Sequence, residues 1–195
     1  MIADVSTTLL VEILATSASL LYVVLMIREN IACWIFGISS SLLSIYLFFD
    51  VQLYSEAVLY GFYAVMGAWG WMHWHRRQEQ DHNPVVRWQL DLHLRAIVLS
   101  CLIALGLGYT LQHFSDAQRP VFNAFTAVFS VWGTYLEINK VLEAWLYWLI
   151  INVASVWLYH DRDLDIYAAL IGVYSVLSVW GYWRWRHTYR MQQAA

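Results

Sequence analysis

Residues 145–161 read WLYWLIINVASVWLYHD. Most of this stretch is apolar enough to lie in lipid, yet Asn152 and Ser155 stand in the middle of it, where hydrocarbon cannot solvate a polar side chain. Polar residues in spanning helices face the interior of a helix bundle or a water-filled cavity. The stretch therefore predicts one helix of a membrane-embedded bundle, with one face turned away from lipid.

The composition of the whole chain leads to the same class of protein. Of its 195 residues, 61% are hydrophobic and 13% are charged, whereas an ordinary soluble domain has about 25% charged residues. The formal net charge is -3 and no basic stripe occurs, so no nucleic-acid partner is expected. The sequence contains no phosphate-binding loop, no metal-ligand spacing and no clustered acid–base pair, so we expect neither an enzyme nor a metal or cofactor site.

Seven segments are long and apolar enough to cross a bilayer, which takes about 20 residues. They are residues 8–27, 31–49, 54–74, 94–112, 120–138, 143–160 and 164–183. The one sizeable loop, residues 75–93, is charged and contains Pro84, which favours a flexible connector.

The basic residues indicate how the chain crosses the membrane, because Lys and Arg concentrate in cytoplasmic loops. With the N-terminus outside, only two basic residues fall in outer loops, Arg119 and Arg162. The inner loops then hold Arg28, Arg76, Arg77, Arg87, Arg95, Lys140, Arg184, Arg186 and Arg190. We therefore predict an external N-terminus and a cytoplasmic C-terminus.

The chain also contains an internal repeat. A shift of 111 residues aligns 34–74 with 145–185 without a gap and gives 13 identities in 41 positions. The shift pairs Asp50 with Asp161, and it pairs Trp69-Gly70 with Trp180-Gly181. Apolar composition alone does not produce matched pairs of this kind. In transporters built from parallel repeats, the substrate site lies between the repeats near the middle of the membrane.

We therefore predict an all-α membrane protein of seven transmembrane helices, in which two parallel three-helix repeats are joined by a linking helix (3+1+3). Residues 1–74 form the first three-helix bundle, and residues 75–119 form a cytoplasmic loop and the linking helix. Residues 120–185 form the second bundle, and residues 186–195 form a cytoplasmic tail.

Aromatic and mildly polar residues recur at helical spacing in four of the spans, so each set shares one helix face. The sixth span carries Trp145, Trp148, Asn152, Ser155 and Tyr159. Its repeat equivalent, the second span, carries Trp34, Gly37, Ser41, Ser44 and Phe48. The third span carries Glu56, Tyr60, Tyr63, Gly67, Trp71 and Trp74, and the seventh carries Tyr167, Tyr174, Ser178, Tyr182 and Trp185.

Two interpretations of these faces stay open. In the first, Asn152 and Ser155 only form hydrogen bonds between helices. In the second, the aromatic faces stack a flat ligand, Asn152 binds its edge, and the intramembrane acids Glu56 and Glu137 attract a cation. Glu143 is interpreted as an ordinary acid at a helix start. The second interpretation gives these candidate substrate-binding residues: Trp34, Ser41, Glu56, Tyr60, Tyr63, Trp71, Trp74, Glu137, Trp145, Trp148 and Asn152.

Residues 29–74 and 142–185 resemble the Pnu vitamin transporters, and the resemblance extends from about residue 9 to 188. Its most specific pieces are W-x-x-W at Trp71 to Trp74 and W-x-x-x-N at Trp148 to Asn152. The resemblance implies a 3+1+3 bundle similar to sugar facilitators of the SWEET type. It further implies a homotrimer in the bacterial inner membrane, where the external N-terminus predicted from the basic residues would be periplasmic. The activity it implies is facilitated diffusion of a vitamin by alternating access, with net uptake driven by a cytoplasmic vitamin kinase.

The resemblance also bears on the substrate. Members that transport nicotinamide riboside carry Gln and Asn on the third span, where this chain has Tyr60 and Gly67, and Asn where it has Ala144. A ligand that needed those amides would leave buried groups unpaired, at about 1–3 kcal/mol each. The sequence therefore favours thiamine, followed by nicotinamide riboside and then riboflavin. A membrane protein that binds a vitamin without translocating it is the other alternative.

Overall fold

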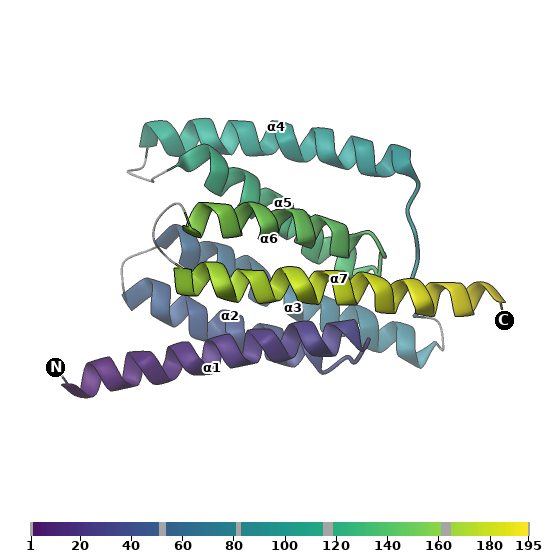
Figure 1. Ribbon diagram of the computed structural model, residues 1–195, viewed down its shortest axis with the longest axis horizontal. Coiled ribbons are helices and arrows are strands. Elements are labelled where there is room, and N and C mark those ends of the chain that lie inside the picture. Colours follow the sequence, from purple (N-terminus) through teal and green to yellow (C-terminus); the bar gives the residue numbers. More distant parts are fainter. Residues whose placement is uncertain (1, 51–53, 81–82, 115–118, 161–164, 195) are drawn as a thin grey trace. The chain divides into compact units, whose positions relative to one another are not determined.

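The computed structural model describes residues 2–50, 54–80, 83–114, 119–160 and 165–194. All of its long elements in these ranges are helices (Figure 1), and their bounds are α1 Ile2–Ile27, α2 Cys33–Asp50, α3 Tyr54–Glu79, α4 Leu90–Phe114, α5 Pro120–Ile138, α6 Ala144–His160 and α7 Asp165–Ala194. Asp161, which the repeat pairs with Asp50, lies outside these residues, as do the side chains of Tyr159 and Tyr167.

The predicted all-α fold of seven helices is confirmed, because each predicted span coincides with one helix. Three described segments are each long and apolar enough to cross a membrane by length and composition: Thr7–Ile27, Cys33–Asp50 and Leu90–His113. Helices α3 and α7 continue past their predicted spans, to Glu79 and Ala194. The C-terminal residues predicted as a tail are therefore a helical extension of α7 as far as Ala194. The 3+1+3 arrangement and the four-part division of the chain stay predictions.

The helices fall into two compact units, Met1–Asn83 and Pro84–Ala195. In the first unit α2 packs against both α1 and α3. The hydroxyl of the buried Ser40 donates to the Ala15 carbonyl at 3.0 Å and so ties α2 to α1. In the second unit α4 packs against α5, α5 against α6, and α6 against α7.

The turn that ends α1 has the same backbone geometry as the turn that ends α5, 111 residues later. Glu29 and Lys140 both adopt left-handed conformations, with φ of 58° and 49°. Two backbone bonds close each turn. In the first, Asn30 N donates to Leu25 O at 3.0 Å and Glu29 N to Met26 O at 2.9 Å; in the second, Val141 N donates to Leu136 O at 2.9 Å and Lys140 N to Glu137 O at 3.0 Å. These are the bonds of the Schellman motif, which satisfies the last carbonyls of a helix. The repeat thus extends upstream of the residues that align in sequence.

The segment that precedes α4 follows a fixed path along the turn between α5 and α6. Val86 N donates to the Lys140 carbonyl at 2.9 Å, and Leu142 N donates to the Val86 carbonyl at 2.8 Å. Val85 is buried, and Val86 forms a parallel bridge with Val141. The predicted flexible connector is therefore wrong for residues 83–89, because two valines and their backbone groups find partners there. The charged composition of residues 75–82 masked this signal in the sequence.

Candidate functional site

Two of the predicted binding residues of the first unit form a packed tryptophan pair. The rings of Trp34 and Trp74 meet edge to face, with centroids 5.5 Å apart and planes at 89°. Gly70 lies against Trp34 so closely that a Cβ there would be 2.6 Å from ring atoms. Both tryptophans are buried. Edge-to-face pairs of this kind contribute about 0.5–1.5 kcal/mol beyond burial of their area.

The second unit contains the same arrangement at the repeat-equivalent positions. The rings of Trp145 and Trp185 meet edge to face at 5.3 Å and 87°. A Cβ at Gly181 would lie 2.5 Å from the Trp145 ring. The matched glycines Gly70 and Gly181 of the sequence are therefore explained by packing within each unit, against Trp34 and Trp145. The structure places Trp34, Trp74 and Trp145 in these buried pairs.

Trp148 takes part in a contact that is reversed between the two repeats. A Cβ at Gly133 on α5 would lie 3.2 Å from the Trp148 indole on α6, so the ring lies over the glycine. The repeat equivalents are Tyr22 on α1 and Gly37 on α2, and there a Cβ on Gly37 would meet the Tyr22 ring at 2.8 Å. Each helix pair thus contains one aromatic ring and one glycine, but the ring is on α6 in one repeat and on α1 in the other. Because of this exchange, α6 carries the Trp148 indole at the position where α2 has Gly37.

Asn152 forms a hydrogen bond between two helices. Its Nδ2 donates to the Ser178 hydroxyl on α7 at 3.3 Å, and both residues are buried. The Ser178 hydroxyl in turn donates to the Tyr174 carbonyl at 2.8 Å. The equivalent residue in the first repeat, Ser41, donates to the Gly37 carbonyl of its own helix at 2.8 Å. The bond supports the first interpretation of Asn152, and a ligand contact through its amide oxygen remains compatible with it.

The aromatic residues of α3 divide into two groups. Tyr60 lies 5.3 Å from Phe48 and 5.6 Å from Tyr63, between ring centroids. Trp71 is 41% exposed and stacks flat on His75, with ring centroids 5.5 Å apart. The predicted α3 face is therefore not one continuous surface, because Gly67, Gly70 and Trp74 are buried whereas Trp71 is exposed.

The two predicted acids also differ in their surroundings. Glu137 is 3% exposed and lies in the last turn of α5. Glu56 is half-buried in the first turn of α3, where its charge complements the helix dipole.

A polar cluster in the second unit centres on Glu143, which the sequence suggested only as a helix-start acid. Its carboxylate accepts hydrogen bonds from Arg87 Nε at 2.8 Å and from Trp88 N at 3.4 Å. His93 Nε2 lies 3.7 Å from the same carboxylate, and His93 Nδ1 lies 3.0 Å from the Tyr147 hydroxyl. The pKa of Arg87 is raised by its hydrogen bond to Glu143. Arg87, like any arginine, is charged throughout the physiological pH range, so it presents a cation to the Glu143 carboxylate.

Sequence reasoning missed Arg87, His93 and Tyr147. Glu143 and Arg87 are 56 residues apart in the chain, and no spacing rule connects positions that distant. The one indication in the sequence was the pair of valines at 85–86 inside a polar loop. Two adjacent apolar residues in such a loop indicate a segment that packs against another part of the protein. No described group of three or more His, Cys, Asp or Glu residues could hold a metal ion.

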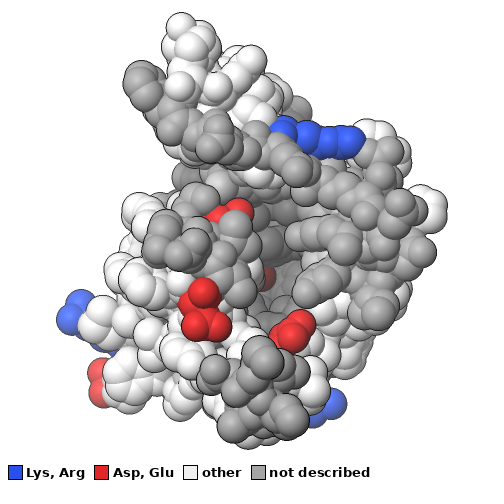
Figure 2. Space-filling model, turned by 90° about the vertical axis from the view of Figure 1, so that its left-hand side faces the viewer, with Lys and Arg blue, Asp and Glu red and all other residues white. Residues whose placement is uncertain are grey.

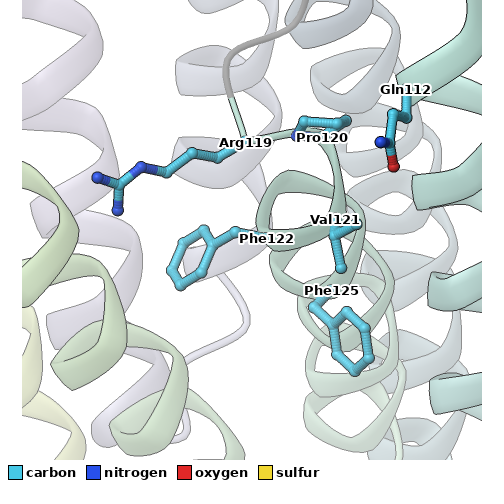
Figure 3. Close-up of a pocket in the computed structure, with 6 residues that line it drawn as sticks. All are labelled: Gln112, Arg119, Pro120, Val121, Phe122 and Phe125. Atoms are coloured by element: carbon cyan, nitrogen blue, oxygen red, sulfur yellow. The ribbon is translucent and has the colours of Figure 1, made fainter.

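An open depression of about 730 Å³ lies where α4 ends and α5 begins, and it is lined by Gln112, Arg119, Pro120, Val121, Phe122 and Phe125. Figure 3 shows Arg119 and Phe122 extending to one side of this turn, while Gln112 approaches Pro120 from α4. The Arg119 guanidinium lies 5.6 Å from the centroid of the Trp157 ring. Figure 2 shows both acidic and basic side chains among the described residues on the face that it draws. None of the predicted binding residues lines the depression.

Comparison with known proteins decides the family. Residues 9–187 match the nicotinamide mononucleotide transporter family. This chain belongs to that family. The nicotinamide riboside transporter PnuC of Escherichia coli (strain K12) is 26% identical over 192 aligned residues, which cover 85% of this chain and 77% of the relative, and PnuC of Shigella flexneri matches equally. A crystal structure of the vitamin B3 transporter PnuC superposes with a TM-score of 0.74 at 20% identity, covering 91% of this chain and 81% of that chain.

The predicted Pnu family is thus confirmed, and the chain is a multi-pass membrane protein of a family of vitamin transporters. Its relatives are transporters and not enzymes. The preference for thiamine finds no support in these comparisons, since PnuC of both species is a transporter of nicotinamide riboside.

Proposed function

We propose that this chain carries nicotinamide riboside across the bacterial inner membrane. The observation that carries the proposal is the match to nicotinamide riboside transporters over 85% of the chain. The ligand chemistry is compatible with the described residues, because a flat cationic pyridine ring suits Trp and Tyr faces. Its carboxamide N–H suits the amide oxygen of Asn152, whose Nδ2 is already bonded to Ser178.

The proposed mechanism is facilitated diffusion by alternating access. With no site for an energy-coupling nucleotide in the sequence, net uptake requires that the substrate be trapped after entry. A cytoplasmic vitamin kinase would trap it, because a phosphorylated product is too costly to pass back through an apolar, aromatic path. We propose in addition that the protein works as a homotrimer, which crosslinking in membranes would test.

Thiamine is the second candidate, on a specific observation at three positions. Tyr60 is a phenol among other rings, and Ala144 is completely buried in an apolar cluster with Leu136 and Val141. A Cβ at Gly67 would lie 2.8 Å from the Ile38 side chain. The amides that the resemblance places here in nicotinamide riboside members therefore have no counterpart, and two of the positions are closed by packing.

Ligand binding and uptake separate these candidates. The purified protein in detergent is titrated with nicotinamide riboside, thiamine and riboflavin while its Trp emission is followed. Labelled ligand is then offered to liposomes that contain the protein. We expect saturable quenching by nicotinamide riboside and its counterflow into liposomes. Quenching by thiamine alone would establish the second candidate, binding without flux would identify a non-translocating binding protein, and no response to any of the three would refute both proposals.

We also propose that the N-terminus is periplasmic and the C-terminus cytoplasmic, from the distribution of basic residues. A cysteine placed at the exposed Gln192, in a background with Cys33 and Cys101 replaced by alanine, should react with an impermeant thiol reagent only in inverted membrane vesicles. Labelling in intact spheroplasts would reverse the assigned orientation.

A further inference from the structure

Helix α6 is attached at two points to the segment that precedes α4 and to the first turn of α4. The first point is Glu143, directly before α6, whose side chain is 12% exposed and accepts hydrogen bonds from Arg87 and Trp88. The second is Tyr147, one turn further, whose hydroxyl bonds His93. Next to both, the backbone bridge between Val86 and Val141 fixes the turn that leads into α6. The start of α6 therefore has little freedom to rotate or slide.

These attachment points lie on one side of α6, whereas the candidate ligand residues lie on the other. At about 100° per residue, Asn152 is about 180° around the helix from Glu143, and Trp148 is about 140° from it. A helix moves as a rigid rod over such short distances, so a rotation at Glu143 displaces Asn152 and Trp148 by a similar angle. The polar cluster is thus placed to set the orientation of the ligand-facing side without touching a ligand.

The first repeat lacks this device among its described residues. The position equivalent to Glu143 is Ala32, whose N–H bonds the side chain of Asn30 at 2.9 Å within the turn itself. The repeats therefore share the helix turn but differ in what fixes the following helix. Helix α6 also carries Trp148 where α2 has Gly37, so it offers the larger candidate binding surface of the two helices. The attachment through Glu143 is therefore found on the helix with the larger surface.

We propose that Glu143 is a positioning residue for vitamin binding, which acts through Arg87, His93 and Tyr147 to hold α6 in the orientation that presents Trp148 and Asn152. The inference rests on the proposed function for its ligand. It predicts that loss of the Glu143 charge weakens vitamin affinity even in protein that stays folded. A role in stability alone would lower the fraction of binding-competent protein and leave the dissociation constant unchanged.

The test uses Glu143→Gln, which keeps the size of the side chain, and Tyr147→Phe, which removes one hydroxyl. Asp91→Asn is the matched control, since Asp91 forms an exposed ion pair with Arg95 at 3.3 Å on α4. Titration with nicotinamide riboside and with thiamine gives the dissociation constant and the binding stoichiometry separately. We expect Glu143→Gln to raise the dissociation constant of whichever vitamin binds by about tenfold, and Tyr147→Phe to raise it by about threefold. These increases correspond to the loss of a charged and of a neutral hydrogen bond of ordinary strength. Asp91→Asn should leave it within about twofold.

Hydrogen exchange of the amides at 146–152, measured without ligand, completes the test. We expect exchange at least about fivefold faster in Glu143→Gln than in Asp91→Asn. Unchanged exchange overturns the inference whether or not a vitamin binds. Faster exchange with an unchanged dissociation constant overturns it as well, because Glu143 would then be a stability residue. Failure of the proposed function is distinguishable, since the unsubstituted protein would bind neither vitamin.

Discussion

Gly181→Ala is expected to lower the thermal stability of the protein, although alanine is the better helix former by about 1 kcal/mol. The added Cβ would lie 2.5 Å from the fused bond of the Trp145 indole. Trp145 cannot move away easily, because it is buried and packs edge to face with Trp185. Overpacking of this kind typically costs about 1–3 kcal/mol. We therefore expect the thermal unfolding midpoint in detergent, measured by scanning fluorimetry, to be lower than that of the unsubstituted protein. Gly181→Val should lower this midpoint further.

The chain supplies its own controls for this prediction. Gly172 and Gly61 are repeat-equivalent helical glycines with no heavy atom within 4 Å of an added Cβ. Their alanine variants should melt at or slightly above the midpoint of the unsubstituted protein. Gly70→Ala should also lower the midpoint, because its Cβ would lie 2.6 Å from the outer edge of the buried Trp34 ring. A Gly181→Ala variant as stable as Gly172→Ala would contradict the close packing of Trp145 on α7.

The sequence was sufficient to predict the helices and the repeat, for a physical reason. Long apolar runs with polar interruptions have few alternative structures in lipid, since every backbone group must be bonded within the segment. The matched glycines carried more specific information, because an indole requires a glycine where a neighbouring helix passes close to it. That requirement is now visible at Trp34 with Gly70 and at Trp145 with Gly181.

The orientation of α3 could not be predicted from its aromatic spacing. Trp is common on packed faces and also at membrane interfaces, so periodicity alone does not distinguish the buried Trp74 from the exposed Trp71. The glycines were the better guide, since Gly67 and Gly70 share the buried face with Trp74. The cluster around Glu143 could not be predicted from the sequence for a different reason. Its partners Arg87 and His93 come from a distant part of the chain.

Asn152→Leu is expected to weaken vitamin binding by about ten- to a hundredfold, which corresponds to the loss of one buried hydrogen bond of about 1–3 kcal/mol. The fold should tolerate the change. The Ser178 hydroxyl keeps its bond to the Tyr174 carbonyl, so no donor is left unsatisfied, and leucine has the same branched side-chain skeleton of four heavy atoms as asparagine. Titration by Trp emission gives the dissociation constant, and scanning fluorimetry verifies that the protein remains folded.

Ser178→Ala is the matched variant that separates the two interpretations of Asn152. It removes the same bond between α6 and α7 from the other end, but it leaves the Asn152 amide in place. If Asn152 binds the vitamin, Asn152→Leu loses affinity and Ser178→Ala stays within about threefold of the unsubstituted protein. Equal losses in both variants would mean that Asn152 only joins helices. If neither variant changes the affinity for the vitamin, Asn152 lies outside the binding site. Its amide would then serve only the packing of α6 against α7.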